Sequence, residues 1–324
     1  MNGRDATSKG GSGRRCRRVV AALIAVLVVS TFHLGCLSFH TGPLPDEPED
    51  DRYTEVDDTR IRYIDVGNAE GPPVVLLHGF NATLNTWDPV IPALTDHHRV
   101  LALDLRGFGF SDRPEDADYS PQGQAQLVFE FLDDRGVETA DVVAHSWGTS
   151  VALAMALEEP ERVDRLALYS AWVYEEQLPT FFYWSRAQGV GEALFALFYR
   201  ERPADKMTQA FYDSSIMTQE FVDEVEEALH RPGALAGALE AVRGQRFDEV
   251  EGNYSSVEQP TLLLWGREDD VTRLSAGERL STQLPNSELV VYPRCGHFPM
   301  LEARHASNHR LAEFLADDAG GGGP

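Results

Sequence analysis

Short apolar runs separated by helical stretches constrain the fold of this chain more than any other feature. Runs of this kind, such as Val74-Val75-Leu76-Leu77, are typical of strands buried on both faces of a sheet. Apolar residues recur with helical spacing between them, for example over 122–134 and 149–159. Strands that alternate with helices predict an α/β fold with a mostly parallel sheet covered by helices on both faces. The predicted strands are 73–78, 100–105, 141–145, 163–169, 261–265 and 288–292, after a hairpin over 53–66, and a last helix is predicted over 309–316.

Residues 172–257 interrupt this alternation. They contain no good buried strand, and their helical stretches are rich in aromatic residues. We predict that they form a helical cap, inserted between the core segments 53–171 and 258–316. Most of the aromatic side chains are expected to pack the cap onto the core, and some to line the site beneath it.

The first forty residues resemble a targeting segment. Four arginines within residues 14–18 directly precede the apolar run 19–32, and Gly35-Cys36 follows it. Residues 1–40 therefore predict either a lipoprotein signal or an uncleaved membrane anchor, and both predict an exported protein tethered to a membrane. Residues 41–52 are acidic and rich in proline, which predicts a solvated linker, and the glycine-rich end 317–324 predicts a disordered tail.

Charge and cysteine content exclude several classes of function. The chain has 324 residues and a formal net charge of -24, with 52 acidic and 28 basic residues. Nucleic-acid binding needs a concentrated basic face, so no nucleic-acid partner is expected. The three cysteines form neither a disulfide framework nor a zinc-type C-x-x-C pair, and the single pair of glycines at 107 and 109 is no dinucleotide fingerprint. We expect no metal and no cofactor.

Ser146 lies where a predicted strand turns sharply into an alanine-rich helix. Such a turn presents the serine hydroxyl at the edge of the sheet and demands small residues two positions before and after it. Gly148 meets that demand, and Ala144 stands where glycine is usual. The pattern predicts Ser146 as a nucleophile.

A serine nucleophile needs a base and an acid that orients the base. His297 follows the last predicted strand through a loop that contains Gly296, so it is the candidate base. Asp269 and Asp270 both follow the preceding strand, and either could orient the histidine. The order Ser–Asp–His along the chain suits this architecture.

The oxyanion of a tetrahedral intermediate needs hydrogen-bond donors. His78-Gly79-Phe80 follows a buried strand, so the backbone N–H of Phe80 is one candidate donor. The N–H of Trp147, the residue after the serine, is the other.

From about residue 53 to 316 the chain resembles the capped α/β-hydrolases with an H-G-F oxyanion loop. The resemblance rests on that loop, on segments 104–112 and 265–269, on the turn at Ser146 and on Gly296-His297, all in the family's order. It implies Asp269 rather than Asp270 as the acid. It also implies that the chain is neither an epoxide hydrolase nor a haloalkane dehalogenase, since those relatives have aspartate where Ser146 stands.

These residues favour a serine hydrolase that cleaves a carboxylic ester through an acyl-enzyme, with a lipid-like ester as one candidate substrate. Amide hydrolysis, C–C bond hydrolysis and perhydrolysis are alternatives on the same site. A binding protein without catalytic activity is the alternative of another class. The complete set of candidate residues argues against it.

Overall fold

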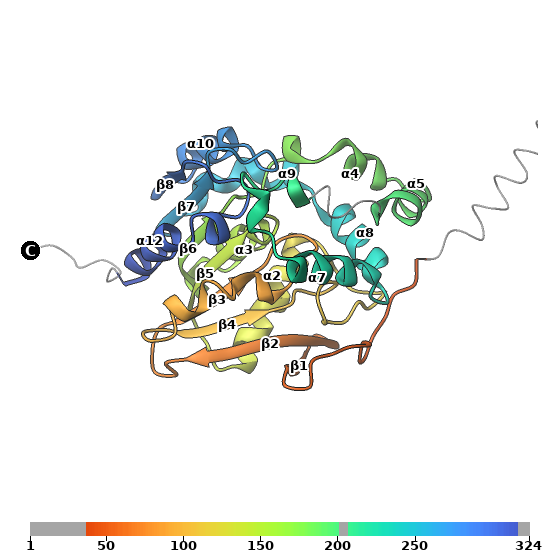
Figure 1. Ribbon diagram of the computed structural model, residues 1–324. Coiled ribbons are helices and arrows are strands. Elements are labelled where there is room, and N and C mark those ends of the chain that lie inside the picture. The colour runs from red at the N-terminus through yellow and green to blue at the C-terminus, as the bar shows by residue number, and fades with distance from the viewer. Residues whose placement is uncertain (1–36, 201–206, 317–324) are drawn as a thin grey trace, which may run out of the picture.

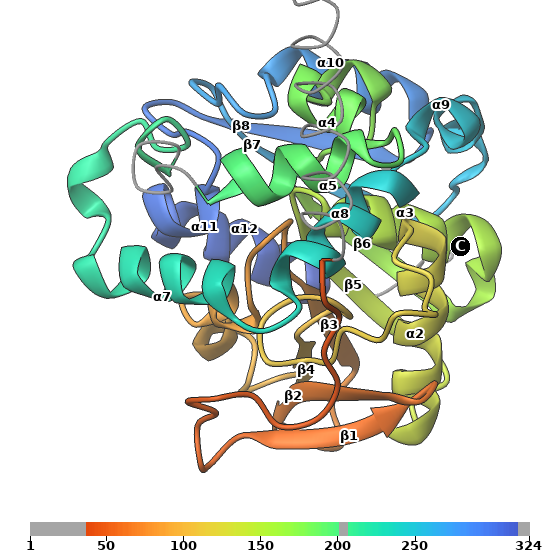
Figure 2. The same cartoon turned by 90° about the vertical axis from the view of Figure 1, so that its right-hand side faces the viewer.

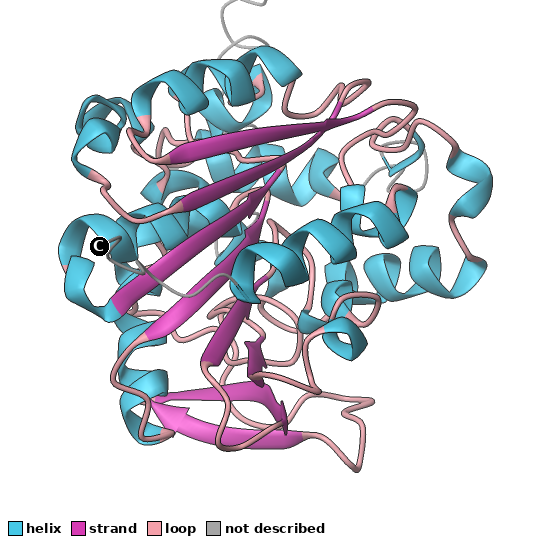
Figure 3. Cartoon of the chain, turned by 90° about the vertical axis from the view of Figure 1, so that its left-hand side faces the viewer, coloured by secondary structure: helices cyan, strands magenta, loops and turns pink. Residues whose placement is uncertain are grey.

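The computed structural model describes residues 37–200 and 207–316, and an eight-stranded sheet forms its centre (Figures 1 and 3). The strand order is β1-β2-β4-β3-β5-β6-β7-β8. β2 is antiparallel to both neighbours, and every pair from β4 to β8 is parallel. This confirms the predicted fold class. The strands are β1 (Arg52–Val56), β2 (Thr59–Gly67), β3 (Pro73–Leu77), β4 (Arg99–Leu103), β5 (Ala140–His145), β6 (Val163–Tyr169), β7 (Thr261–Gly266) and β8 (Ser287–Tyr292).

Helices cover both faces of the sheet (Figure 3). The longer ones are α2 (Pro121–Asp134), α3 (Gly148–Glu158), α7 (Gln219–His230), α8 (Ala234–Gly244), α10 (Leu274–Gln283) and α12 (Arg304–Ala316). The shorter ones are α4 (Thr180–Ser185), α5 (Val190–Leu194), α9 (Phe247–Val250) and α11 (Pro299–Glu302). The 3-10 helices are η1 (Leu84–Trp87), η2 (Ile91–Ala93), η3 (Pro160–Arg162), η4 (Glu175–Gln177), η6 (Ser214–Ile216) and η7 (Glu251–Ser256), and η5 (Phe195–Tyr199) is a π-helix.

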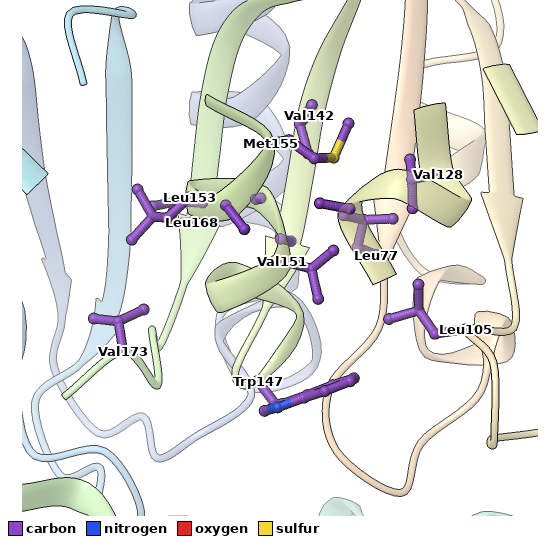
Figure 4. Packing of buried hydrophobic residues seen from close by; sticks show 14 of the residues in the cluster. Leu77, Leu105, Val128, Val142, Trp147, Val151, Leu153, Met155, Leu168 and Val173 are labelled. Atoms are coloured by element: carbon purple, nitrogen blue, oxygen red, sulfur yellow. The ribbon is translucent and has the colours of Figure 1, made fainter. Parts of the chain in front are cut away.

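The core has two layers because successive strand residues point to opposite faces. On β5, Val142 belongs to the cluster beneath α2, α3 and α10, whereas Val143 belongs to the cluster beneath α12, η1 and η2. Val151 and Met155 of α3 pack toward the strands in the first cluster (Figure 4). Strands buried on both faces explain why the sequence shows unbroken apolar runs.

The predicted strands all form, with ends that differ by one or two residues. The hairpin turns at Asp57 and Asp58, whose φ angles are +47° and +52°. Two consecutive residues with positive φ fit a two-residue turn of the type that matches strand twist. This hairpin forms one edge of the sheet, with β1 as the outermost strand.

Between β6 and β7 the described residues form helices and turns from η4 to η7 and no strand. This helical insertion is the predicted cap. It lies over the end of the sheet where β5 leads into α3 (Figures 1 and 2).

Most residues of the segment 41–52 are exposed, as in a solvated linker, but a few of them contact the folded domain. Leu44 is buried, and Glu47 forms an ion pair with Arg60 at 2.7 Å. Asp51 and Arg62 form a second pair at 2.5 Å. Glu47 and Asp51, two of the acidic residues that suggested a linker, therefore form ion pairs with arginines of β2.

The described residues contain no helix long and apolar enough to cross a membrane. The predicted targeting segment, up to residue 36, and the predicted tail 317–324 lie outside the described residues.

Candidate active site

The turn between β5 and α3 holds Ser146 in an uncommon backbone conformation. Its φ is +51°, a region that non-glycine residues enter only where their surroundings hold them. The Ser146 N–H donates to Tyr169 O of β6 at 2.9 Å. A Cβ atom on Gly148 would lie 2.4 Å from the backbone oxygen of His78, so the position needs glycine. Ala144 is accommodated in the first core cluster.

Ser146, His297 and Asp269 form a continuous chain of hydrogen bonds. Ser146 Oγ lies 2.9 Å from His297 Nε2, and His297 Nδ1 lies 2.9 Å from Asp269 Oδ2. All three residues are buried, with at most 4% of their surface exposed. With the Nδ1 proton donated to the carboxylate, Nε2 is free to accept the serine proton.

The structure distinguishes the two neighbouring aspartates. Asp270 is exposed, whereas Asp269 accepts hydrogen bonds from the N–H groups of Val271 (2.9 Å) and Thr272 (2.8 Å). The hydroxyl of Thr272 donates to its second oxygen at 2.8 Å. Burial on its own would raise the pKa of Asp269, but the facing His297 and these donors outweigh it and hold the pKa below its usual value. The residue therefore stays ionised opposite the histidine.

The two candidate oxyanion donors flank the serine. Among the described residues, no acceptor is recorded for the backbone N–H of Phe80 or of Trp147. A Cβ atom on Gly79 would lie 3.0 Å from Ser146 Cβ, so the loop passes close to Ser146. Unpaired N–H groups in such a place can stabilise negative charge on a bound oxygen.

His78 holds the peptide that carries one of these donors. Its Nδ1 lies 2.7 Å from Gly79 O, and its Nε2 accepts from Leu105 N at 3.0 Å. Gly79 O and Phe80 N belong to the same planar peptide unit. A hydrogen bond to the carbonyl therefore also fixes the direction of the Phe80 N–H.

Contacts behind the histidine fix its loop. His145 Nε2 lies 2.9 Å from His297 O. Burial, together with the adjacent His297, lowers the pKa of His145 to about 3, so it is neutral and donates this hydrogen bond. On the cap side, Ala210 O accepts from His297 N at 2.7 Å.

Glu302 joins the histidine loop to the cap. Its carboxylate accepts from Gly296 N (2.7 Å), Tyr212 N (2.8 Å) and Asp213 N (3.2 Å). Burial raises the pKa of Glu302. Glu302 and Thr272 were not predictable as site residues from the sequence, because both act through contacts that only the fold creates. Glu302 lies in the short helix that follows His297, which is the only signal the sequence offers.

Aromatic side chains from the core and the cap meet around the site. The ring of Phe80 lies 5.2 Å from Phe182 of α4 and 6.0 Å from Trp147, centroid to centroid. On the histidine side, Phe298 stacks on Phe211 of the cap at 4.8 Å. The surroundings of Ser146 are therefore largely apolar.

Cys295 is no rival nucleophile. It is fully buried, and burial raises the pKa of its thiol, which disfavours the reactive thiolate.

Comparison with known proteins identifies the family of this chain. The family model described as alpha/beta hydrolase fold matches residues 72–304. The chain belongs to the α/β-hydrolase fold family. Within this family, a 2-hydroxy-6-oxo-2,4-heptadienoate hydrolase of Pseudomonas putida is 31% identical over 265 residues, which cover 78% of this chain and 91% of the relative.

Two solved α/β-hydrolase structures are also similar. A meta-cleavage product hydrolase of Pseudomonas fluorescens has 29% identity and a TM-score of 0.71, and the match covers 82% of this chain and 97% of that one. A membrane phospholipase A, described as a bacterial virulence factor, has 26% identity and a TM-score of 0.68, with 92% and 91% covered. The relatives support the assignment of this α/β-hydrolase as a hydrolytic enzyme.

Proposed function

We propose that this α/β-hydrolase cleaves a neutral carboxylic ester with an apolar, lipid-like acyl chain, through an acyl-enzyme on Ser146. The observation that carries the proposal is the hydrogen-bonded chain from Ser146 through His297 to Asp269, with two free N–H groups beside it. That arrangement supplies a nucleophile, a base, an orienting acid and oxyanion donors.

In the proposed mechanism, Ser146 Oγ attacks the ester carbonyl carbon while His297 Nε2 takes the hydroxyl proton. The carbonyl oxygen becomes an oxyanion that accepts hydrogen bonds from the N–H groups of Phe80 and Trp147. The C–O bond to the alcohol then breaks, and His297 returns the proton to the leaving oxygen. Water, deprotonated by His297, then attacks the acyl carbon. The bond to Ser146 Oγ breaks, His297 returns the proton to Oγ, and the acid is released.

The apolar surroundings support a neutral, lipid-like substrate. The rings of Phe80, Phe182 and Phe298 offer no charged partner to a substrate, and burying an unpaired charge among them would be costly. The similarity to a membrane phospholipase A points in the same direction.

C–C bond hydrolysis is the second candidate, because several relatives are named as hydrolases of 2-hydroxy-6-oxo dienoates. Such substrates carry a carboxylate. Two cap arginines already bind protein carboxylates, Arg186 with Glu175 and Arg243 with Glu192. Arg200, the arginine nearest in sequence to Phe195, donates instead to the backbone oxygen of Leu229. The apolar rings around Ser146 nevertheless favour a neutral ester over a carboxylate.

A series of nitrophenyl esters tests this choice. We expect kcat/KM to rise from acetate to medium-length acyl chains and to be lost in Ser146→Ala. A 2-hydroxy-6-oxo-dienoate, assayed in parallel, should be cleaved much more slowly. Faster cleavage of the dienoate than of the esters would contradict ester hydrolysis and favour C–C bond hydrolysis.

We also propose that the protein is exported and tethered to a membrane through the apolar run 19–32. Detergent-phase partitioning of the whole chain tests this, and removal of residues 1–32 should abolish it. Loss of partitioning in Cys36→Ser alone would indicate a lipoprotein, whereas unchanged partitioning would indicate an anchor. Partitioning that persists after the deletion would contradict the tether.

A further inference from the structure

The cap exposes large hydrophobic side chains on α4, α5 and η5. Tyr183 and Trp184 are 61% and 62% exposed, and Leu197 and Phe198 are 55% and 48% exposed. We call these four residues and Val190, which is 45% exposed, the cap apolar face. Single exposed hydrophobic residues are ordinary, but several on adjacent short helices indicate a surface that something covers.

The same helices also bury apolar side chains on their inner sides. Phe182 of α4 and Phe195 of η5 are 9% and 0% exposed, with ring centroids 6.4 Å apart. Trp184 and Leu197 come two residues after them, about 200° further around a helix, and so face away from that contact. A helix that is apolar all round is normally covered on every side. The outer side of α4 and η5 lacks such a cover among the described residues.

The described chain begins beside this cap. The backbone of His40 pairs with that of Arg113, and His40 contacts Gly233 at the start of α8. α8 packs against α4 and η5, and both views place this entry beside α8 and α5 (Figures 1 and 2). Five residue steps from Phe32 to Leu37 span at most about 17 Å. The apolar run 19–32 therefore joins the protein close to its cap.

We propose that the cap apolar face docks on the surface of an electrically neutral lipid bilayer, the same bilayer that the N-terminal run would enter. The inference rests on the tether of the proposed function. Trp and Tyr are suited to the interface between lipid and water, because their rings are largely apolar while the indole N–H or the hydroxyl can hydrogen-bond to water.

The negative charge of the protein favours a zwitterionic bilayer over an anionic one. The net charge is -24, and α7 of the cap alone carries five acidic residues. An anionic bilayer would repel this surface, so docking depends on apolar contact with a zwitterionic one. We therefore expect little weakening by salt, in contrast to docking through basic residues.

Tryptophan fluorescence in the whole chain tests the docking directly. The chain has five tryptophans, of which Trp184 is 62% exposed and the others at most 8%. The full-length protein is reconstituted in phosphatidylcholine vesicles with or without brominated acyl chains, which quench only rings that reach them. We expect brominated lipid to quench part of the emission, and this quenched part to be absent in Trp184→Phe.

Activity gives a second readout. The double variant Leu197→Ser/Phe198→Ser should hydrolyse a vesicle-borne ester about tenfold more slowly than wild type, because it loses two apolar contacts. Hydrolysis of soluble nitrophenyl acetate should not change. Val66→Ser is the matched control, since Val66 is also exposed, at 39%, but lies on β2.

The outcomes separate this inference from the function on which it rests. Vesicle-bound protein without quenching of Trp184 overturns the docking and leaves the tether intact, and a crosslinked dimer formed through this face would then identify a second copy as its cover. Protein that does not bind vesicles overturns both tether and docking. Failure to hydrolyse soluble esters concerns the proposed chemistry alone.

Discussion

Replacing Asp269 with asparagine tests how the carboxylate acts on His297. One carboxylate oxygen of Asp269 accepts from two backbone N–H groups, Val271 and Thr272. The amide oxygen of an asparagine must take that place, so its NH2 group would face His297 Nδ1. Nδ1 would then have to accept a hydrogen bond, and the proton would move to Nε2.

A histidine protonated at Nε2 cannot accept the proton of Ser146. In a serine protease the same change lowers kcat about 10⁴-fold, which corresponds to roughly 5.5 kcal/mol in the barrier. We expect a loss of that order here, since Asp269 is 3% exposed and water cannot easily replace it. Asp270→Asn is the matched control, and its exposed side chain predicts less than about a twofold change.

The assay is kcat for nitrophenyl butyrate, with thermal unfolding measured in parallel to confirm that both variants fold. A loss below tenfold in Asp269→Asn, or a large loss in Asp270→Asn, would refute this role for Asp269.

Three further predictions concern the supports of the site and the core. Gly148→Ala should lower the free energy of unfolding by about 1–3 kcal/mol and reduce kcat, because its methyl group would meet His78 O at 2.4 Å. The control Ala144→Gly should keep most activity. Variants that change the thermal unfolding of the protein equally would contradict this prediction. Glu302→Ala should lower kcat about tenfold with a smaller change in KM, since the Gly296 loop loses its acceptor; an unchanged kcat would show that the loop is held without it. Burial raises the pKa of Asp141 to about 7, against the lowering effect of Arg165. The folded state therefore binds the proton more tightly than the unfolded state, and stability should fall as pH rises from about 4 to 7. The free energy of unfolding of Asp141→Asn, measured with urea, should lack this pH-dependent contribution. The same pH dependence in the wild type and the variant would contradict the raised pKa of Asp141.

Much of the fold was predictable because buried parallel strands leave a direct trace in sequence. Val74 to Leu77 must be apolar at every position, since both faces of β3 are covered. The turn at Ser146 was equally readable, because its crowding restricts the residues around it.

The remaining features depend on contacts between distant segments. The ion pairs of Glu47 and Asp51 escaped prediction because their arginine partners come within reach only once β2 is placed in the sheet. Thr272 and Glu302 hold Asp269 and the histidine loop through contacts that no local pattern marks. Asp269 and Asp270 could be told apart from the residues only by resemblance, and burial separates them in the structure.

Covalent labelling with a fluorophosphonate tests the central claim most directly. The reagent phosphonylates a serine only when a base activates it, and intact mass with peptide mapping locates the adduct. We expect one adduct per chain, on Ser146, and none in Ser146→Ala. A wild-type protein that stays unlabelled, or an alanine variant that labels equally well, would contradict it.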